Sequence, residues 1–445
     1  MKRFVKKLVL FVLKVLAKRR VKRFKGKVIV VTGSVGKTST KDAIFTILNT
    51  QYKVKKSKKS MNTDFGLLLT ILDIESGFSS AIKWSWVLVK GLFNSLFRDL
   101  SDVWLFEFGV DKPKDMDFLI SVVKPDIAVM TNIFPVHLDF GQFKNLQDIF
   151  EEKKKIVDAL KRNGTAVLNI DNPFLADLAK SRGKREGEFA ATGRGSWQKL
   201  GNPSDRLTIT FSKDDVANYY ATNIKLSEAE TVFILHHKDK RYEVPFPVLG
   251  EYQVYAAMAA IICGELMGIS LENSILALQR FSLPAGRMSV IAGKNGSTIL
   301  DSSYNSSPEA LKEALKILKS LGEGKRKIAV LGNMNELGEN SRALHHGAGG
   351  LVPSCADLLI TVGVQAKVMA EAAMEKGMDE KSVHSFDSAT AAADFFTSKI
   401  KEGDLILVKG SQNNVRLEKF VKAMMAHPED AKSVLVRQEK VWEKM

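Results

Sequence analysis

The stretch Val28-Ile-Val-Val-Thr-Gly-Ser-Val-Gly-Lys-Thr-Ser-Thr40 decides the fold of the first half of this chain. Its apolar run predicts a buried strand, and the glycine turn after it delivers Lys37 and Thr38 to the start of a helix. Backbone N–H groups and a helix N-terminus bind phosphates, a lysine neutralises their charge, and a threonine can hold Mg²⁺. The alternative is an ordinary strand–turn–helix with a chance lysine. We predict that ATP binds at Gly33, Ser34, Gly36, Lys37, Thr38 and Ser39.

The motif is a partial one. A complete Walker A sequence has a glycine where this chain has Val31, so what remains is a short loop from Gly33 to Thr38.

The composition is ordinary for a globular protein, with 45% apolar and 26% charged residues. A chain of 445 residues is long enough for two or three domains, each with its own core. The two cysteines, Cys263 and Cys355, are far apart and form no CxxC pair, which disfavours a disulfide scaffold or a zinc site. This cysteine usage fits a reducing cytoplasm.

The net charge of +16 comes mostly from one end of the chain. Residues 1–27 contain twelve lysines and arginines and no acidic residue. The rest of the chain is nearly balanced, so the basicity indicates a local tail and not a nucleic-acid-binding surface.

Residues 1–24 place a cationic edge beside an apolar face at helical spacing, which predicts an amphipathic helix on an anionic inner leaflet. The uncharged run Leu8–Leu13 is too short to span a bilayer. The alternative is a helix that packs on the protein body with its lysines in water. Residues 83–98 carry two tryptophans among apolar and basic residues, which suits a headgroup interface, although an ordinary core helix would look similar. We therefore expect peripheral contact with the cytoplasmic face of the membrane.

Strand-like runs alternate with helical patterns, which predicts an α/β fold: a P-loop ATPase-type, mostly parallel sheet with a small antiparallel section, then a Rossmann-like sheet. The predicted domains are residues 1–26 (basic helix), 27–284 (ATP-binding) and 285–445 (C-terminal). Strands of the first sheet are expected at Val28–Thr32, Val103–Phe108, Ile127–Ile133 and Ala166–Ile170. Three short antiparallel strands are expected at Leu207–Phe211, Val232–Leu235 and Tyr242–Val244, followed by a buried helix at Val254–Met267. Strands of the second sheet are expected at Ser297–Leu300, Lys327–Leu331, Leu358–Val362 and Leu405–Val408.

Three side chains at predicted strand ends or on a predicted helix are considered as candidate site residues. Glu107 ends an apolar strand, where open α/β sheets bind ligands, so it is a candidate Mg²⁺ ligand; the alternative is an exposed strand-end acid. His137 follows another strand, although by itself it is better explained as a structural histidine. Lys153 lies in the run Glu151–Lys155, which by charge pattern alone predicts a solvated helix face.

These residues, taken in order, resemble the Mur ligase family, and within it the branch that adds D-alanyl-D-alanine to a UDP-N-acetylmuramoyl-tripeptide. The resemblance runs from about Val28 to about Lys422. It rests on eight motifs: Thr32–Thr40, Asn62–Gly66, Glu107–Gly109, Thr131–Ile133 with His137, Arg287, Asp301–Asn305 with Pro308, Gly332–Met334 with Glu336–Gly338, and Lys409–Ser411.

The resemblance implies an ATP-dependent amide ligase of peptidoglycan-precursor synthesis, and hence of cell shape and division. ATP would phosphorylate a peptide carboxylate, and an amine would displace phosphate from the acyl phosphate. By this resemblance Lys37 contacts the phosphates, Thr38 and Glu107 hold a first Mg²⁺, and His137 and Lys153 (as its carbamate) serve a second metal. Further nucleotide contacts are implied for Asn62, Arg287, Asp301, Tyr304 and Asn305.

The chain also departs from the family pattern. Family members usually carry an N-terminal domain for the UDP-sugar ahead of the phosphate loop, and here only the basic helix precedes that loop. The sugar nucleotide would be held elsewhere, or by a separate protein, or the acceptor would differ and be lipid-linked. Gln412 stands where an arginine often follows Lys-Gly-Ser, which weakens the inference of a dipeptide donor. The alternatives are a Mur-like ligase with another acceptor or donor, and a membrane-tethered ATP-binding switch without ligation.

Overall fold

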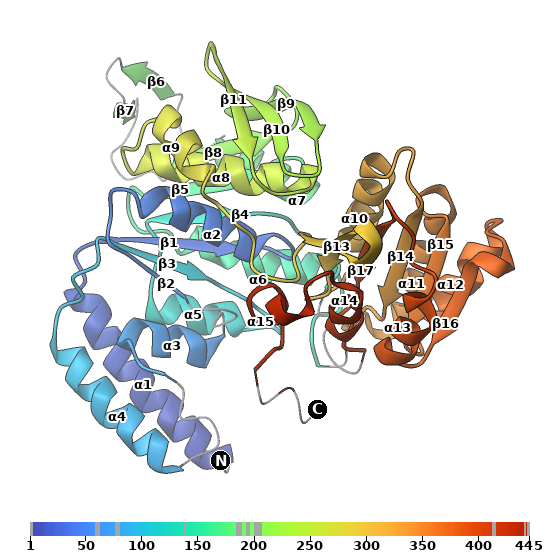
Figure 1. Cartoon of the computed structure of the whole chain (residues 1–445). Helices are drawn as coiled ribbons and strands as arrows, with labels where there is room; N and C mark the ends of the chain where they lie inside the picture. The colour runs from blue at the N-terminus through green and yellow to red at the C-terminus, as the bar shows by residue number, and fades with distance from the viewer. Residues whose placement is uncertain are drawn as a thin grey trace.

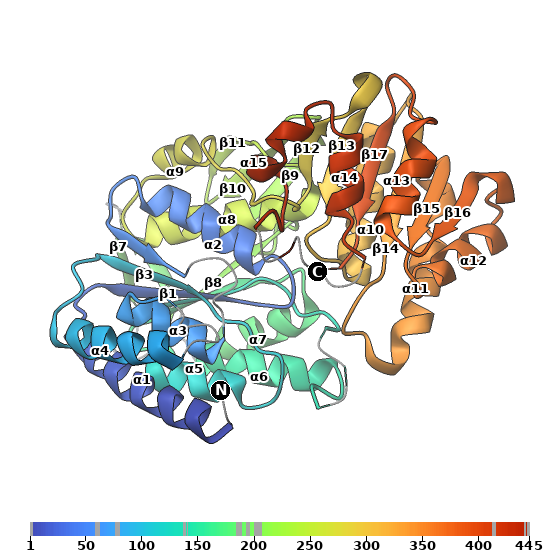
Figure 2. The same ribbon diagram turned by 60° about the horizontal axis from the view of Figure 1, so that its bottom comes forward.

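The structure is a computed structural model, and it describes residues 3–57, 63–75, 81–136, 139, 141–183, 189–192, 196–199, 207–411, 415–439 and 442. Two sheets with their covering helices lie side by side (Figures 1 and 2). The first sheet has nine strands: β1 Lys27–Thr32, β2 Val54–Lys56, β3 Val103–Glu107, β4 Ile127–Met130, β5 Thr165–Asn169, β8 Leu207–Ser212, β9 Tyr219–Leu226, β10 Thr231–His237 and β11 Lys240–Phe246.

The strand order of this sheet is β11-β10-β9-β8-β5-β4-β1-β3-β2, so β1 lies between β4 and β3 and pairs with both in parallel. The predicted mostly parallel sheet is confirmed, and β9, β10 and β11 form its antiparallel section. The antiparallel prediction for Leu207–Phe211 is wrong, because β8 pairs in parallel with both β5 and β9. Helix α7 (Pro173–Gly183) lies between β5 and β8 in the sequence, and a crossover of this length returns the chain in the same direction. A separate hairpin consists of β6 Phe189–Thr192 and β7 Ser196–Lys199.

Both faces of the sheet are covered by helices (Figure 1). Alternate residues of β1 point to opposite faces, so that Val28 and Val30 enter one hydrophobic cluster while Ile29 and Val31 enter the other. Helices on the first face are α1 Arg3–Arg23, α3 Asp64–Leu72, α4 Ala81–Leu96, α5 Asp115–Val122, α6 Leu146–Asp158 and α7. Helices on the second face are α2 Lys37–Leu48, α8 Val254–Leu266 and α9 Leu271–Leu278.

The predicted basic N-terminal helix is α1, and it is part of the core. Val9, Leu13, Leu16 and Ala17 are buried in the same cluster as the first face of the sheet. Just after the helix, the ring of Phe24 stacks on the Trp104 ring with their centroids 3.9 Å apart. Among the described residues, no helix is both long enough and apolar enough to cross a membrane.

A buried ion pair joins α1 to the segment that follows α4. Arg20 donates to the Asp99 carboxylate at 3.0 Å, with 9% and 3% of the two side chains exposed, and Lys55 also donates to Asp99. Burial alone would raise the pKa of Asp99, but hydrogen bonds from Lys55 and Ser101 outweigh it and lower the pKa to about 2. The carboxylate is therefore better stabilised in the folded protein than in the unfolded chain.

Asp99→Asn should lower the free energy of unfolding at pH 7 by about 3 kcal/mol, because Arg20 then loses its buried anionic partner. The folded pKa lies below the unfolded value of about 3.9, so the carboxylate stabilises above that pH and its contribution fades as the pH falls toward 2. Urea unfolding at several pH values measures both effects. The difference between wild type and variant should shrink below pH 4. A difference that grows on acidification would refute the assigned direction, and Asp215→Asn on the surface is the matched control.

The second sheet has the order β12-β13-β17-β14-β15-β16 and is parallel except for its edge strand β12, as expected for a Rossmann-like unit. Its strands are β12 Ser289–Ala292, β13 Thr298–Ser302, β14 Lys327–Gly332, β15 Leu358–Val362, β16 Val383–Phe386 and β17 Leu405–Lys409. Its helices are α10 Pro308–Leu321, α11 Ser341–Gly349, α12 Lys367–Glu375, α13 Ala389–Thr397, α14 Glu418–Met424 and α15 Ala431–Val434.

Candidate active site

The loop between β1 and α2 is held tightly against the strand-end loop that follows β4. Gly33 adopts a φ of 147°, and a Cβ there would lie 2.1 Å from the Thr131 hydroxyl, so no larger residue fits. The Ser34 N–H donates to the Asn132 carbonyl at 2.7 Å. Gly36, at φ 86°, is the residue before the first turn of α2. The loop is therefore fixed in a shape that leaves the helix N-terminus ready to accept an anion.

Lys37 is the first residue of α2, and its side chain folds back into the loop. The ammonium donates to the carbonyls of Gly33 at 2.9 Å and Ser34 at 3.1 Å. Burial lowers the pKa of Lys37, while the negative charges of Glu107 and Asp111 oppose that shift. The amine thus lies in the loop where phosphate oxygens would meet it.

Thr38 and Glu107 come together from different elements, α2 and the end of β3. The Thr38 hydroxyl donates to the Glu107 carboxylate at 2.9 Å. Glu107 is buried, with 4% of its surface exposed, so the alternative of an exposed strand-end acid is wrong. A hydroxyl and a carboxylate side by side, next to the glycine loop, form an oxygen pair of the kind that magnesium prefers.

Lys153 lies on α6 with its side chain wholly buried, and its amine has no hydrogen-bond partner among the described residues. Burial lowers the pKa of Lys153 well below its ordinary value, and the nearby Lys37 lowers it further. The solvated-face prediction from the charge pattern is therefore wrong for this residue. Ile149, Lys153 and Ile156 follow one buried stripe of the helix at spacings of four and three.

The second sheet contributes to the same place. An Arg287 guanidinium nitrogen lies 3.4 Å from the Thr38 hydroxyl and donates to it. The guanidinium also lies over the Tyr304 ring, 4.3 Å from its centroid. A further contact between the two units is the hydrogen bond that the Gly338 N–H donates to the Asp139 carboxylate at 2.7 Å. Residues from both units therefore border the phosphate loop.

Other predicted residues lie at the carboxyl end of β13. Asp301 is fully buried and accepts from the Ser303 N–H at 3.0 Å, and burial raises the pKa of Asp301 to about 6. The carbonyl of Asn305 accepts from the Lys409 amine at 3.0 Å. Neither Asp301 nor Asn305 has a hydrogen bond to the phosphate loop in the described structure. Asn62 and His137 lie outside the described residues.

Comparisons with known proteins bear on this arrangement of residues. A family profile described as Mur ligase middle domain matches residues 31–201 and 191–264, which is more than half of the chain. The chain belongs to the Mur ligase family. A second profile, described as Mur ligase, glutamate ligase domain, matches residues 286–412.

Individual relatives agree with this assignment. This Mur ligase is 28% identical over 415 residues to the UDP-N-acetylmuramoyl-tripeptide–D-alanyl-D-alanine ligase of Bacillus subtilis. The match covers 93% of this chain and 79% of the relative. It is 28% identical over 408 residues to the enzyme of that name from Mycobacterium leprae. The match covers 87% of this chain and 71% of the relative. Its fold is similar to that of MurF ligase from Thermotoga maritima in complex with ADP, with a TM-score of 0.74 and 26% sequence identity. The match covers 95% of this chain and 84% of that structure.

Some residues around the site of this Mur ligase were not predicted. Lys41, one turn after Lys37, is buried with its amine 3.9 Å from the Glu107 carboxylate. The i, i+4 spacing of the two lysines on α2 is the signal that could have revealed it. Arg437 donates to the Tyr304 carbonyl at 2.7 Å and to Glu418 at 2.9 Å, which fixes the loop carrying Tyr304. No local pattern marks Arg437, because its partners lie far away in the sequence.

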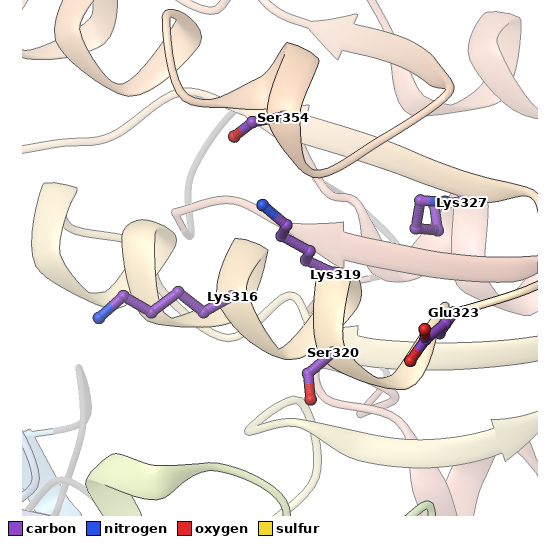
Figure 3. A pocket seen from close by; sticks show the side chains of 6 residues that line it. All are labelled: Lys316, Lys319, Ser320, Glu323, Lys327 and Ser354. Atoms are coloured by element: carbon purple, nitrogen blue, oxygen red, sulfur yellow. The ribbon is translucent and has the colours of Figure 1, made fainter.

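A surface hollow of about 610 Å³ lies away from the Mur ligase site, beside α10 and the start of β14 (Figure 3). Its lining residues are Lys316, Lys319, Ser320, Glu323, Lys327 and Ser354. Lys316 and Lys327 are already paired, with Glu313 at 2.8 Å and Asp357 at 3.2 Å respectively. We assign no role to this hollow.

Proposed function

We propose that this chain is an ATP-dependent amide ligase that adds D-alanyl-D-alanine to a UDP-N-acetylmuramoyl-tripeptide-type carboxylate. One observation carries the proposal: Lys37, Thr38, Glu107 and Arg287 converge on one phosphate loop from three separate parts of a Mur ligase chain. The relatives named above carry this activity in their names. We place the reaction in the cytoplasm and divide the chain into the basic N-terminal helix at 1–26 and two units at 27–284 and 285–445.

The reaction follows from the weakness of a carboxylate as an electrophile. A carboxylate oxygen of the acceptor attacks the γ-phosphorus of ATP, and ADP leaves with the electron pair of the broken P–O bond. The amine of the donor then attacks the acyl carbon, and the tetrahedral adduct expels phosphate and loses a proton to give the amide. In this scheme Lys37 and the N-terminus of α2 bind the phosphates, and Arg287 orients the transferred group.

Thr38 and Glu107 fit a magnesium ion. Magnesium takes oxygen ligands and is usually bound through one or two protein groups, with phosphates and waters completing the octahedron. Among the described residues, no group of three His, Cys, Asp or Glu side chains is arranged to hold a metal. When bound, the ion would neutralise charge on the transferring phosphoryl group.

Lys153 is a candidate for carbamylation. An ammonium repels a cation, so the unmodified side chain does not fit a metal. The neutral amine can attack CO₂ and lose a proton, which forms a carbamate whose single negative charge is shared by two oxygens. The buried nitrogen without a partner, in surroundings that favour the neutral amine, supports this assignment. By the family resemblance, the carbamate of Lys153 and the side chain of His137 would hold a second magnesium ion, and Asn62 would contact the nucleotide.

Two other functions compete with this proposal. A Mur-like ligase with a different acceptor or donor would have the same phosphate site, and Gln412 leaves the donor open. A membrane-tethered ATP switch would bind and hydrolyse nucleotide without forming an amide. The buried Lys153 favours the ligase, because a switch has no use for a second metal site.

Phosphate release from purified protein with ATP and Mg²⁺ tests the proposal. Release should require both the UDP-linked tripeptide and D-alanyl-D-alanine, and mass spectrometry should find the amide product. Release from ATP and Mg²⁺ with neither substrate present, and without an amide product, would favour the switch. Turnover with a lipid-linked peptide or another amine, and not with the named pair, would support the broader Mur-like ligase instead.

A further inference from the structure

Helices α1 and α4 present an apolar outer face to solvent. Of the sixteen large apolar side chains that are exposed in the described structure, ten lie on these two helices or within four residues after α4. They are Leu8, Phe11, Val15, Trp86, Val89, Leu92, Phe93, Leu96, Phe97 and Leu100. We call this set the α1/α4 face. We propose that the α1/α4 face is a docking surface for an anionic lipid bilayer, a function independent of the proposed ligase chemistry.

The outer stripe of α1 is separate from its buried stripe. Leu8, Phe11 and Val15 follow one another at helical spacing and are 53%, 65% and 50% exposed. Leu13 and Ala17, on the opposite side of the helix, are fully buried against the sheet. One face of α1 therefore packs against the core, and its second apolar stripe is exposed to solvent.

Helix α4 repeats the pattern with larger side chains. Trp86 is 71% exposed and Phe93 is 60% exposed, and the Phe93 and Phe97 rings lie with their centroids 4.7 Å apart. On the inner side Val87 is buried, and a Cβ on Gly91 would touch Leu16 of α1. An exposed cluster of this size is unusual on a protein surface that faces only water.

The two helices are held in fixed positions, so the face is preformed. They run beside each other on the outside of the molecule (Figure 1). Arg20 is paired with Asp99 at 3.0 Å, and Arg23 donates to the Ser95 carbonyl at 3.2 Å. Both contacts join the carboxyl-terminal ends of the helices, so the stripes run in the same direction.

The charges around the α1/α4 face identify the occupant. Residues 1–27 and 81–98 contain no aspartate or glutamate. Exposed basic side chains border the apolar stripes, namely Lys7, Lys18, Arg19, Lys22, Lys83, Lys90 and Arg98. Apolar side chains with tryptophan and a basic rim are complementary to acyl chains and anionic headgroups. A second copy on a two-fold axis would place this positive face against itself, which disfavours self-association.

Vesicle sedimentation of the full chain tests the proposal. Wild type should pellet with vesicles of phosphatidylcholine and phosphatidylglycerol and stay in solution with phosphatidylcholine alone. The triple variant Phe11→Ser, Trp86→Ser, Phe93→Ser should lower the partition coefficient by at least about a hundredfold. The triple variant Lys7→Glu, Lys18→Glu, Lys22→Glu should lower it by at least about a hundredfold, since each basic group near an anionic surface is worth about a factor of five. All six residues are exposed, so the fold is expected to persist.

Matched controls use surface residues far from α1 and α4. Val216→Ser, Leu276→Ser, Val364→Ser removes apolar side chains of 77%, 57% and 76% exposure, and Lys319→Glu, Lys376→Glu, Lys401→Glu makes the same change of charge. Both controls should pellet like wild type. Equal loss of binding in test and control variants would overturn the proposal. So would a wild-type dimer in sedimentation equilibrium without vesicles that the Phe11, Trp86, Phe93 variant abolishes, because the face would then be a self-interface.

Discussion

Lys37→Met should reduce kcat/KM for amide formation by about a thousandfold, the upper end of the loss seen when one preorganised charge-stabilising group is removed. Methionine keeps most of the aliphatic stem and removes the ammonium that donates to the Gly33 and Ser34 carbonyls. The phosphates of ATP would then face the N-terminus of α2 without a neutralising cation. Steady-state phosphate release measures the loss of turnover, and calorimetry measures the loss of ATP affinity.

Stability separates a chemical role of Lys37 from a structural one. Because burial already disfavours the Lys37 ammonium, its removal should leave the urea midpoint within experimental error of wild type. Lys144→Met, at an exposed position in the same unit, is the control and should retain full activity. If Lys37→Met turns over within threefold of wild type, the phosphates do not bind at this loop.

Lys153→Ala should have the second largest effect, a loss of about a hundredfold or more in kcat, if its carbamate supplies charge that the reaction needs. Short carboxylic acids, which can place an anionic oxygen in the cavity left by the side chain, should restore part of the activity to Lys153→Ala. Wild type should lose activity in CO₂-free buffer and recover it on addition of bicarbonate.

A spectroscopic measurement tests the modification directly. Wild type prepared with ¹³C-bicarbonate should show a carbamate carbon signal by NMR, and Lys153→Ala should not show it. Lys154→Ala is the control, because that neighbouring lysine is partly exposed and paired with Glu151 at 3.0 Å. An unmodified lysine in fully active wild-type protein would refute the carbamate and with it the assigned role of Lys153.

Local sequence was sufficient to predict the strand–turn–helix on which the proposed phosphate site is built. The strand Lys27–Thr32, the turn with two glycines at positive φ, and the helix from Lys37 lie within one short segment, where sequence spacing translates directly into geometry. The same reasoning located Glu107 at the end of β3. These features depend on propensity and alternation, which a single sequence records.

Contacts between distant segments could not be predicted in this way. Arg287 reaches Thr38 across 249 positions, and only the packing of one sheet unit on the other brings them together. The parallel direction of β8 depends on the path of the chain after β5, and not on the composition of the strand. The burial of Lys153 is hidden by its charged neighbours Glu151 and Lys154, which indicate a solvated helix face. The apolar residues Ile149 and Ile156 at helical spacing mark the buried stripe on which Lys153 lies.

The burial of α1 has a consequence for release from the bilayer proposed above. Leu13 and Ala17 pack in the same cluster as Val28 and Val30 of β1, so a protease that removed this helix would also disturb the strand that leads into the candidate site. Detachment by cleavage of α1 would therefore also inactivate the proposed enzyme. Reversible release would have to come from ionic strength or from a change in lipid charge, which leaves the polypeptide whole.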